Sequence, residues 1–151
     1  MSGLACHRDH AMLRLPFAAA VLALAALPSS AAAQDADITL TFETGARTGT
    51  VMVTLYDSEA AWSGGAPVAQ MRIDAAVPTP VAVFRGLPAG TYGAKAFHDV
   101  DGDGEMDTNP FGIPTEPFAF SNNAVVNMGP PGWEQARFAV EGPTAQTLQL
   151  R

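Results

Sequence analysis

Cysteine is nearly absent from this chain. The one that is present, Cys6, lies in the N-terminal segment, so the remainder has no thiol from which a disulfide could form. Basic side chains are also few, because eight lysines and arginines stand against 15 aspartates and glutamates, giving a formal net charge of −7. The basic residues do not cluster, which argues against a nucleic-acid partner. The 151 residues are enough for one domain, whose stability must come from a packed core.

Residues 1–33 have the pattern of a secretory signal peptide. Two arginines precede an apolar run over residues 15–27, and Ala31–Ala33 match the small-residue pattern at which such a signal is cleaved. An uncleaved membrane anchor is the alternative, but Pro28 and the small residues after it disfavour one. We therefore expect a mature domain over residues 34–151 that is periplasmic or secreted and has no membrane span.

After residue 35, apolar and polar side chains alternate, which is typical of half-buried β-strands. The pattern predicts seven strands, over residues 38–42, 51–56, 68–75, 81–84, 92–97, 136–140 and 148–150. Proline and glycine separate most of them, and we expect the first two to form a hairpin. Many short strands with almost no helical period predict an all-β fold, a seven-stranded antiparallel β-sandwich.

Aromatic residues mark three further features. Tyr92 follows a turn rich in glycine and proline, and is predicted to be the corner tyrosine of a β-sandwich. Trp62 ends a predicted helical turn over residues 59–62 and is expected to plug an edge of the sandwich. Residues 108–133 contain five prolines and four aromatic residues without a clear period, and predict one long loop. The aromatic side chains of that loop either cap the sandwich or form a ligand surface.

The most informative stretch directly follows His98. It places five carboxylates in nine residues, at Asp99, Asp101, Asp103, Glu105 and Asp107. The spacing of the first three, followed by a glycine, matches the D-x-[DN]-x-[DN]-G start of a calcium-binding EF-hand loop. Calcium takes six to eight oxygen ligands, and a bound cation would relieve the repulsion between these side chains. We therefore predict a calcium site with these five residues as its metal-site candidates.

The match to an EF-hand ends before position 12, where Pro110 stands in place of the bidentate glutamate. A missing ligand must then come from elsewhere, and Glu116, Asn122 and Asn123 are the candidates. Without that glutamate we expect weak binding, with a Kd of about 0.1–1 mM. The alternatives are magnesium and a solvated acidic turn without an ion, because aspartate and glycine favour turns for backbone reasons alone.

Three functions remain open at this point. The first is a non-enzymatic module whose calcium loop orders the adjacent long loop for binding or for stability, with an unidentified protein or glycan as partner. The second is a carbohydrate-binding or surface-polymer-binding domain, as many β-sandwiches are. Its candidate contact residues are Trp62, Trp133, Phe118 and Phe120.

The third function is a hydrolase. His98 adjoins a carboxylate and is the only histidine outside the signal segment, but it would need Ser58, Ser63 or Ser121 as a nucleophile. No nucleophile motif surrounds any of these serines. We therefore predict a protein that is not an enzyme, with no catalytic residues and no organic cofactor.

Several short strings occur in an order that is typical of one family. They are Leu55–Ser58, Gly86–Tyr92, Ala96–Asp99 with its acidic loop, Phe111–Glu116, Phe120–Asn123 and Gly129–Pro131. In these strings the chain resembles DUF2141, a family of exported bacterial proteins, over essentially all of residues 36–151. The resemblance implies an Ig-like or transthyretin-like β-sandwich and carries over no activity.

Overall fold

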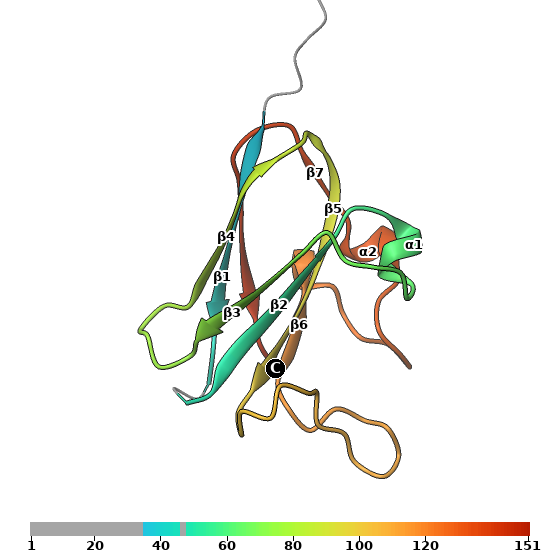
Figure 1. Cartoon of the computed structure of the whole chain (residues 1–151). Coiled ribbons are helices and arrows are strands. Elements are labelled where there is room, and N and C mark those ends of the chain that lie inside the picture. Colours follow the sequence, from blue (N-terminus) through green and yellow to red (C-terminus); the bar gives the residue numbers. More distant parts are fainter. Residues whose placement is uncertain (1–34, 46–47) are drawn as a thin grey trace, which may run out of the picture. The chain divides into compact units, whose positions relative to one another are not determined.

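The computed structural model describes residues 35–45 and 48–151, so the expected signal peptide lies outside the described residues (Figure 1). The described chain consists of short strands joined by turns and single-turn helices. In chain order these elements are β1 (Ala36–Glu43), β2 (Thr50–Tyr56), α1 (Glu59–Trp62), β3 (Ala69–Asp74), β4 (Val81–Leu87), β5 (Gly90–Asp99), β6 (Phe118–Phe120), η1 (Ser121–Asn123), α2 (Trp133–Ala136), β7 (Phe138–Val140) and β8 (Thr144–Gln149). None of the helices in this part of the chain is long and apolar enough to span a membrane.

Two sheets pack face to face, which confirms the predicted all-β sandwich (Figure 1). One sheet has the strand order β4-β1-β8, and the other has the order β3-β2-β5-β6, with β7 pairing to the start of β5. Several details differ from the prediction. The strand predicted over residues 136–140 begins only at Phe138, because residue 136 ends α2. An eighth strand, β6, lies inside the segment that was expected to be a loop, and β1 pairs with β8 in parallel rather than antiparallel.

The hairpin predicted from the first two strands is wrong. β1 lies between β4 and β8, whereas β2 lies between β3 and β5 in the other sheet. Alternate residues of both strands are almost fully buried against each other's sheet, namely Ile38, Leu40 and Phe42 of β1, with Val51, Val53 and Leu55 of β2. The alternation of apolar and polar residues shows which face of a strand is buried but not which strand lies beside it. A β1–β2 hairpin and the observed placement in opposite sheets would bury the same face of each strand.

Tyr92 is the corner tyrosine that the sequence predicts. Its ring is buried in the core, and its hydroxyl donates a hydrogen bond to the Pro88 carbonyl oxygen at 2.8 Å. This bond holds the turn between β4 and β5, so it fixes where β5 begins. The acidic loop starts at the other end of the same strand.

A second, smaller cluster of aromatic side chains covers the outer face of the five-stranded sheet. Ser58 caps α1 by accepting a hydrogen bond from the Ala61 amide, and the helix delivers Trp62 to the sheet. Trp62 and Trp133 are only 5% and 8% exposed, with ring centroids 6.0 Å apart, and the Trp62 indole donates to the Pro131 carbonyl oxygen. Both tryptophans therefore plug the sandwich instead of offering an exposed surface.

Gly93 is expected to be intolerant of a side chain because the two indoles lie directly on it. An added Cβ would be 2.8 Å from Cζ3 of Trp133 and 3.1 Å from Cζ3 of Trp62. We expect Gly93→Ala to lower the free energy of unfolding by roughly 1–3 kcal/mol, as overpacking does. Urea denaturation followed by tryptophan fluorescence measures this change. Gly142→Ala is the control, since no atom lies within 4 Å of the added Cβ. Equal losses in the two variants would contradict the packing explanation.

Candidate functional site

The acidic loop is folded around the carboxylate of its first residue. Asp99 ends β5 and is 3% exposed, and its two oxygens accept the backbone amides of Gly102 at 2.7 Å and Gly104 at 3.0 Å. Both glycines have a φ of +85°, in the left-handed region that a Cβ disfavours. Gly104 is position 6 of the calcium-loop motif, and its left-handed backbone makes the sharp turn that the motif predicts there.

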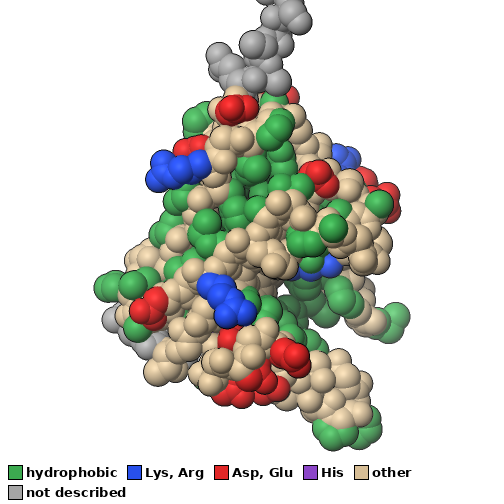
Figure 2. Space-filling model, viewed as in Figure 1, with side chains coloured by type: hydrophobic (Ala, Val, Ile, Leu, Met, Phe, Trp, Pro, Cys, Tyr) green, Lys and Arg blue, Asp and Glu red, His purple; other side chains and the backbone are tan. Residues whose placement is uncertain are grey.

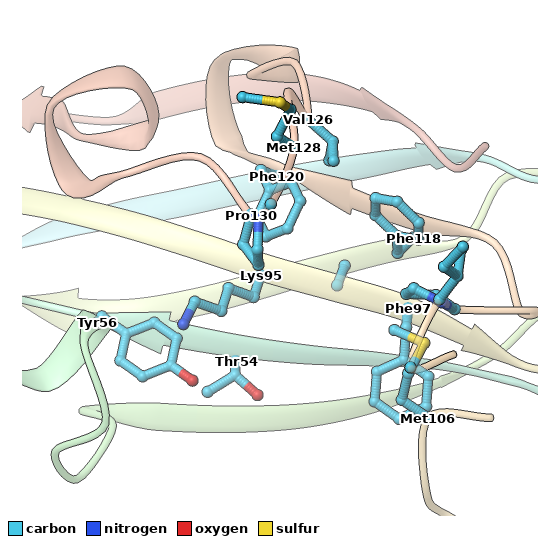
Figure 3. Close-up of a pocket in the computed structure, with 15 residues that line it drawn as sticks. Thr54, Tyr56, Lys95, Phe97, Met106, Phe118, Phe120, Val126, Met128 and Pro130 are labelled. Carbon is cyan, nitrogen blue, oxygen red and sulfur yellow. The ribbon is translucent and has the colours of Figure 1, made fainter. Parts of the chain in front are cut away.

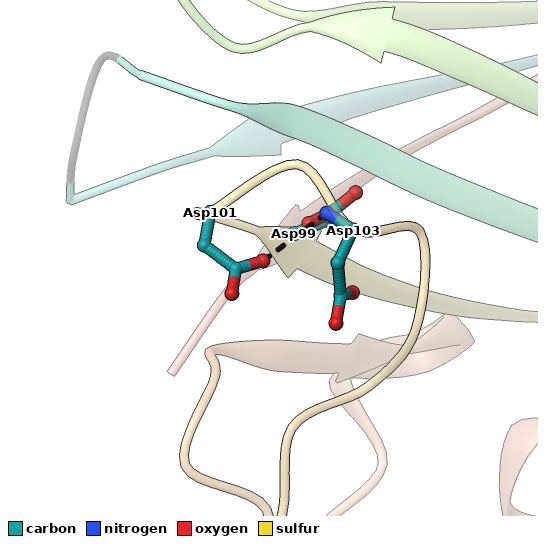
Figure 4. A group of neighbouring side chains, drawn as sticks. All are labelled: Asp99, Asp101 and Asp103. Carbon is teal, nitrogen blue, oxygen red and sulfur yellow. Dashed lines mark hydrogen bonds between the residues drawn. The ribbon is translucent and has the colours of Figure 1, made fainter.

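The next two aspartates repeat the same local pattern at the surface. Asp101 accepts the amide of Asp103 (Figure 4). Asp103 in turn accepts the amide of Glu105 at 2.7 Å. These bonds turn the chain so that one carboxylate oxygen from each of Asp99, Asp101 and Asp103 lies within 4.8 Å of the others. Two ligands of one calcium ion, each about 2.4 Å from it, lie up to about 5 Å apart, so this spacing is compatible with a shared ion.

Glu116 is the distant residue that joins the loop. Its carboxylate is buried, with Oε1 accepting the Val100 amide at 2.7 Å and Oε2 accepting the Asp107 amide at 3.2 Å. Carboxylate oxygens of Asp101, Asp107 and Glu116 form a second group within 4.8 Å. Of the three residues considered as a substitute for the glutamate at position 12, Glu116 is therefore the one that the fold brings to the loop.

Asn122 and Asn123, the other two candidates, form hydrogen bonds outside the acidic loop. The Asn122 amide donates to the backbone carbonyls of Gln135 and Arg137, and Asn123 bonds to the backbone of Thr147 and Gln149. Both adopt positive φ and shape the turn after β6, so neither reaches the acidic loop. Glu105 lies outside both groups of converging carboxylates, and its backbone carbonyl is the atom that the EF-hand pattern would use.

The loop has an excess of negative charge. Figure 2 shows acidic side chains gathered at the lower end of the described domain. The ion pairs among the described residues join Arg85 to Asp37 and Arg137 to Glu134, so neither neutralises the loop. The carboxylate of Asp101, followed by desolvation and the carboxylates of Asp103, Glu116 and Asp99, raises the pKa of Asp107 above its ordinary value. Hard cations such as calcium bind to such a set of oxygens.

His98 and the three serines do not form a connected set. His98 is fully buried, with Nε2 at 2.6 Å from the Thr48 carbonyl oxygen, and its Nδ1 has no hydrogen-bond partner among residues 35–45 and 48–151. Ser58 caps α1, Ser63 is exposed, and Ser121 is buried with its hydroxyl bonded to backbone atoms. Within the described residues, no hydrogen bond links His98 to a serine.

A cavity of about 750 Å³ lies on the outer face of the five-stranded sheet, beside the segment that follows the acidic loop. Its floor is formed by outward-facing side chains of the sheet, among them Thr54, Tyr56, Lys95 and Phe97 (Figure 3). Phe118 and Phe120 of β6 also line it, whereas Trp62 and Trp133 do not. The sequence reasoning named the two phenylalanines but missed the cavity, because its walls come from segments that meet only in the fold.

Lys95 lies at one end of the cavity among aromatic rings. Its Nζ donates to the Trp62 carbonyl oxygen at 2.7 Å, and lies 4.7 Å from the ring centroid of Tyr56 and 4.4 Å from that of Trp62. These contacts stabilise the ammonium by hydrogen bonding and by cation–π attraction. Burial acts in the opposite direction and lowers the pKa of Lys95.

The chain matches the model of one known protein family. The model of DUF2141, a family described as an uncharacterized protein conserved in bacteria, matches residues 43–148. No curated protein and no solved structure matches the chain. The matched range begins at the last residue of β1 and covers strands β2 to β7, the acidic loop, Glu116 and most of the chain. This protein therefore belongs to the DUF2141 family.

Proposed function

We propose that the protein is an exported, non-enzymatic β-sandwich module in which a calcium ion, held by the acidic loop, orders residues 107–117 for stability or for binding. The observation that carries this proposal is the convergence of Asp101, Asp107 and the buried Glu116, whose carboxylate oxygens lie within 4.8 Å of one another. Asp107 and Glu116 lie at the two ends of residues 107–117, so one ion would bind both ends of the segment.

Calcium is the ion that this ligand chemistry favours. Every candidate side chain is a carboxylate, with no histidine or cysteine in either group, and hard oxygen ligands select calcium or magnesium over zinc. Glu116 contributes one carboxylate oxygen to its group, and calcium tolerates such irregular geometry better than magnesium. A divalent cation also turns the mutual repulsion of the carboxylates into attraction.

The segment closed by these residues is otherwise held by local bonds only. Its backbone bonds link Asn109 with Ile113 and Gly112, and Thr115 with Asp107, and an isolated bridge pairs Thr108 with Pro114. The Asn109 side chain also accepts the amides of Phe111 and Ile113. Phe111, at its tip, is 88% exposed. Few buried contacts make such a loop easy to open, so a tie at its base is expected to decide how ordered it is.

The test is the effect of calcium on thermal unfolding. At a calcium concentration ten times the Kd, linkage gives about 1.4 kcal/mol of added stability, or a rise in Tm of roughly 3–10 °C over chelator. Chymotryptic cleavage after Phe111 is expected to slow in the same range, because the loop that carries it becomes ordered. Magnesium at equal concentration is expected to have a smaller effect.

A pair of charge-neutralising variants makes the test specific. Asp101→Asn with Asp103→Asn is expected to abolish the calcium response, and to raise Tm in chelator because fewer like charges meet. Glu43→Gln with Glu141→Gln removes the same charge from two exposed sites on the sandwich, and is expected to retain the full response. An unchanged Tm with millimolar calcium, or an equal response in both double variants, would refute the proposal.

A further inference from the structure

The cavity beside β5 has chemistry that the proposed calcium loop does not use. We infer that it binds a single-chain amphipathic carboxylate, such as a fatty acid, with the carboxylate at Lys95 and the hydrocarbon chain along Phe97, Phe118 and the opposite loop walls. The floor of this site and its only charge come from the strands, whereas one of its walls belongs to the segment that the proposed calcium ion would order.

The shape of the cavity fits a small ligand. Its volume of about 750 Å³ lies within the range of about 300–1,000 Å³ that ligand pockets occupy. One wall is formed by Met106 with Gly112, Ile113 and Pro114, and the other includes Val126, Met128 and Pro130. Figure 2 shows the hollow between these walls as largely hydrophobic.

The polar groups of the cavity gather at one end. Figure 3 shows the Thr54 hydroxyl, the Tyr56 hydroxyl and the Lys95 nitrogen near one another, with Phe97 and Met106 at the opposite end. The remaining lining residues have apolar side chains or are glycines. A ligand that fills this space must be polar at one end only, which disfavours a glycan with hydroxyls along its whole length.

The single charge in the cavity selects the sign of the ligand. Lys95 is the only charged residue among those that line it, and it is the only lysine of a chain with a net charge of −7. An ammonium has three donors, and the described residues provide one acceptor, the Trp62 carbonyl oxygen. A carboxylate would supply a second acceptor and would offset the desolvation that lowers the pKa of this lysine.

The cavity walls also expose apolar side chains that a hydrocarbon chain would cover. Ile113, Val126 and Met128 are 60%, 42% and 104% exposed, which is unusual for neighbouring large apolar residues. Met128 holds a positive φ of 55°, and methionine side chains adapt readily to ligands of different shape. Burial of this surface by an acyl chain supplies the affinity, and Lys95 supplies the orientation.

The experiment is calorimetric titration of the purified protein with dodecanoate below its micellar concentration, in chelator. Chelator prevents precipitation of calcium soaps, and the strand residues Lys95, Phe97 and Phe118 line the site without any need for the ion. We expect saturable 1:1 binding, with dodecanol, which lacks the carboxylate, at least tenfold weaker. Trp62 lies against Lys95, so the intrinsic fluorescence is expected to change with the same saturation curve.

Variants then locate the site. Lys95→Met is expected to weaken dodecanoate binding at least tenfold and to remove the preference over dodecanol, whereas Arg85→Met, which removes an exposed cation from β4, leaves both unchanged. Met128→Asp places a carboxylate on a fully exposed wall position that has little role in folding, and is expected to weaken binding several-fold.

Four results would overturn the inference. Three of them are no saturable binding of monomeric dodecanoate, equal affinity for dodecanol, and a preference for dodecanoate that survives Lys95→Met in a folded protein. Binding to phosphatidylglycerol vesicles without binding of monomeric dodecanoate would likewise overturn it, because a membrane surface would then be the occupant.

Discussion

Gly49→Ala is expected to destabilise the protein by roughly 2–5 kcal/mol, the largest effect predicted for the addition of one methyl group. Gly49 precedes β2 with a φ of +79°, and an added Cβ would overlap the Asp99 carbonyl oxygen and lie 2.8 Å from the Cα of Val100. The left-handed conformation costs about 1–2 kcal/mol for an L-residue, and overpacking adds about 1–3 kcal/mol. Urea unfolding followed by fluorescence of the two buried tryptophans measures the sum.

Gly86→Ala is the matched control for this prediction. Gly86 has a φ of +64°, but no atom lies within 4 Å of an added Cβ. Alanine there has the conformational cost alone, about 1–2 kcal/mol. The difference between the two variants is the cost of the clash with the start of the acidic loop. Equal losses would show that the close approach of Gly49 to Asp99 has no energetic weight.

Ser121→Ala is expected to lower the free energy of unfolding by about 2–4 kcal/mol, although it removes a single oxygen atom. Ser121 is fully buried, and its hydroxyl accepts the Ala94 amide at 2.9 Å and donates to the Ala136 carbonyl oxygen at 2.6 Å. It thereby continues the pairing of β5 at the point where β6 has ended and joins β5 to α2. The variant leaves two buried backbone groups without a partner, each costing about 1–3 kcal/mol.

Ser63→Ala is the control, because Ser63 is exposed at the end of α1. Loss of its hydroxyl is expected to change the free energy of unfolding by less than about 0.5 kcal/mol.

The same pair of variants also bears on the hydrolase alternative. If Ser121→Ala unfolded at the wild-type urea concentration but lost an esterase activity, the hydroxyl would be a nucleophile rather than a structural group.

The strands that the sequence predicted well are those with one fully buried face. Along β1, Ile38, Leu40 and Phe42 alternate with polar residues, so the burial pattern is written directly in the sequence. β6 has only three residues and follows Pro117, and it forms because β5 offers it a free edge. β8 extends back to Thr144, beyond its predicted start, since parallel pairing with β1 uses backbone groups and needs no apolar side chain there.

In the acidic loop, too, the features set by nearby residues were predictable and those set by distant residues were not. The spacing of Asp99, Asp101 and Asp103 determines the turn geometry because each carboxylate bonds to an amide a few residues ahead. The approach of Glu116 depends on the return of the chain towards β5, which no local spacing encodes. Glu116 therefore appeared only as one of three candidates, and the cavity, which is built from several segments, did not appear at all.

The parallel pairing of β1 with β8 has a consequence for the order in which the protein folds. It aligns Ile38 with Thr144, so the central strand of its sheet gains its second neighbour only after nearly all of the chain is available. Contacts between residues so distant in sequence slow folding, because the intervening chain must be closed into a loop first. Until then one edge of β1 is open to pairing with another molecule. A chain that stopped before Thr144 is therefore expected to aggregate rather than to fold into a smaller sandwich.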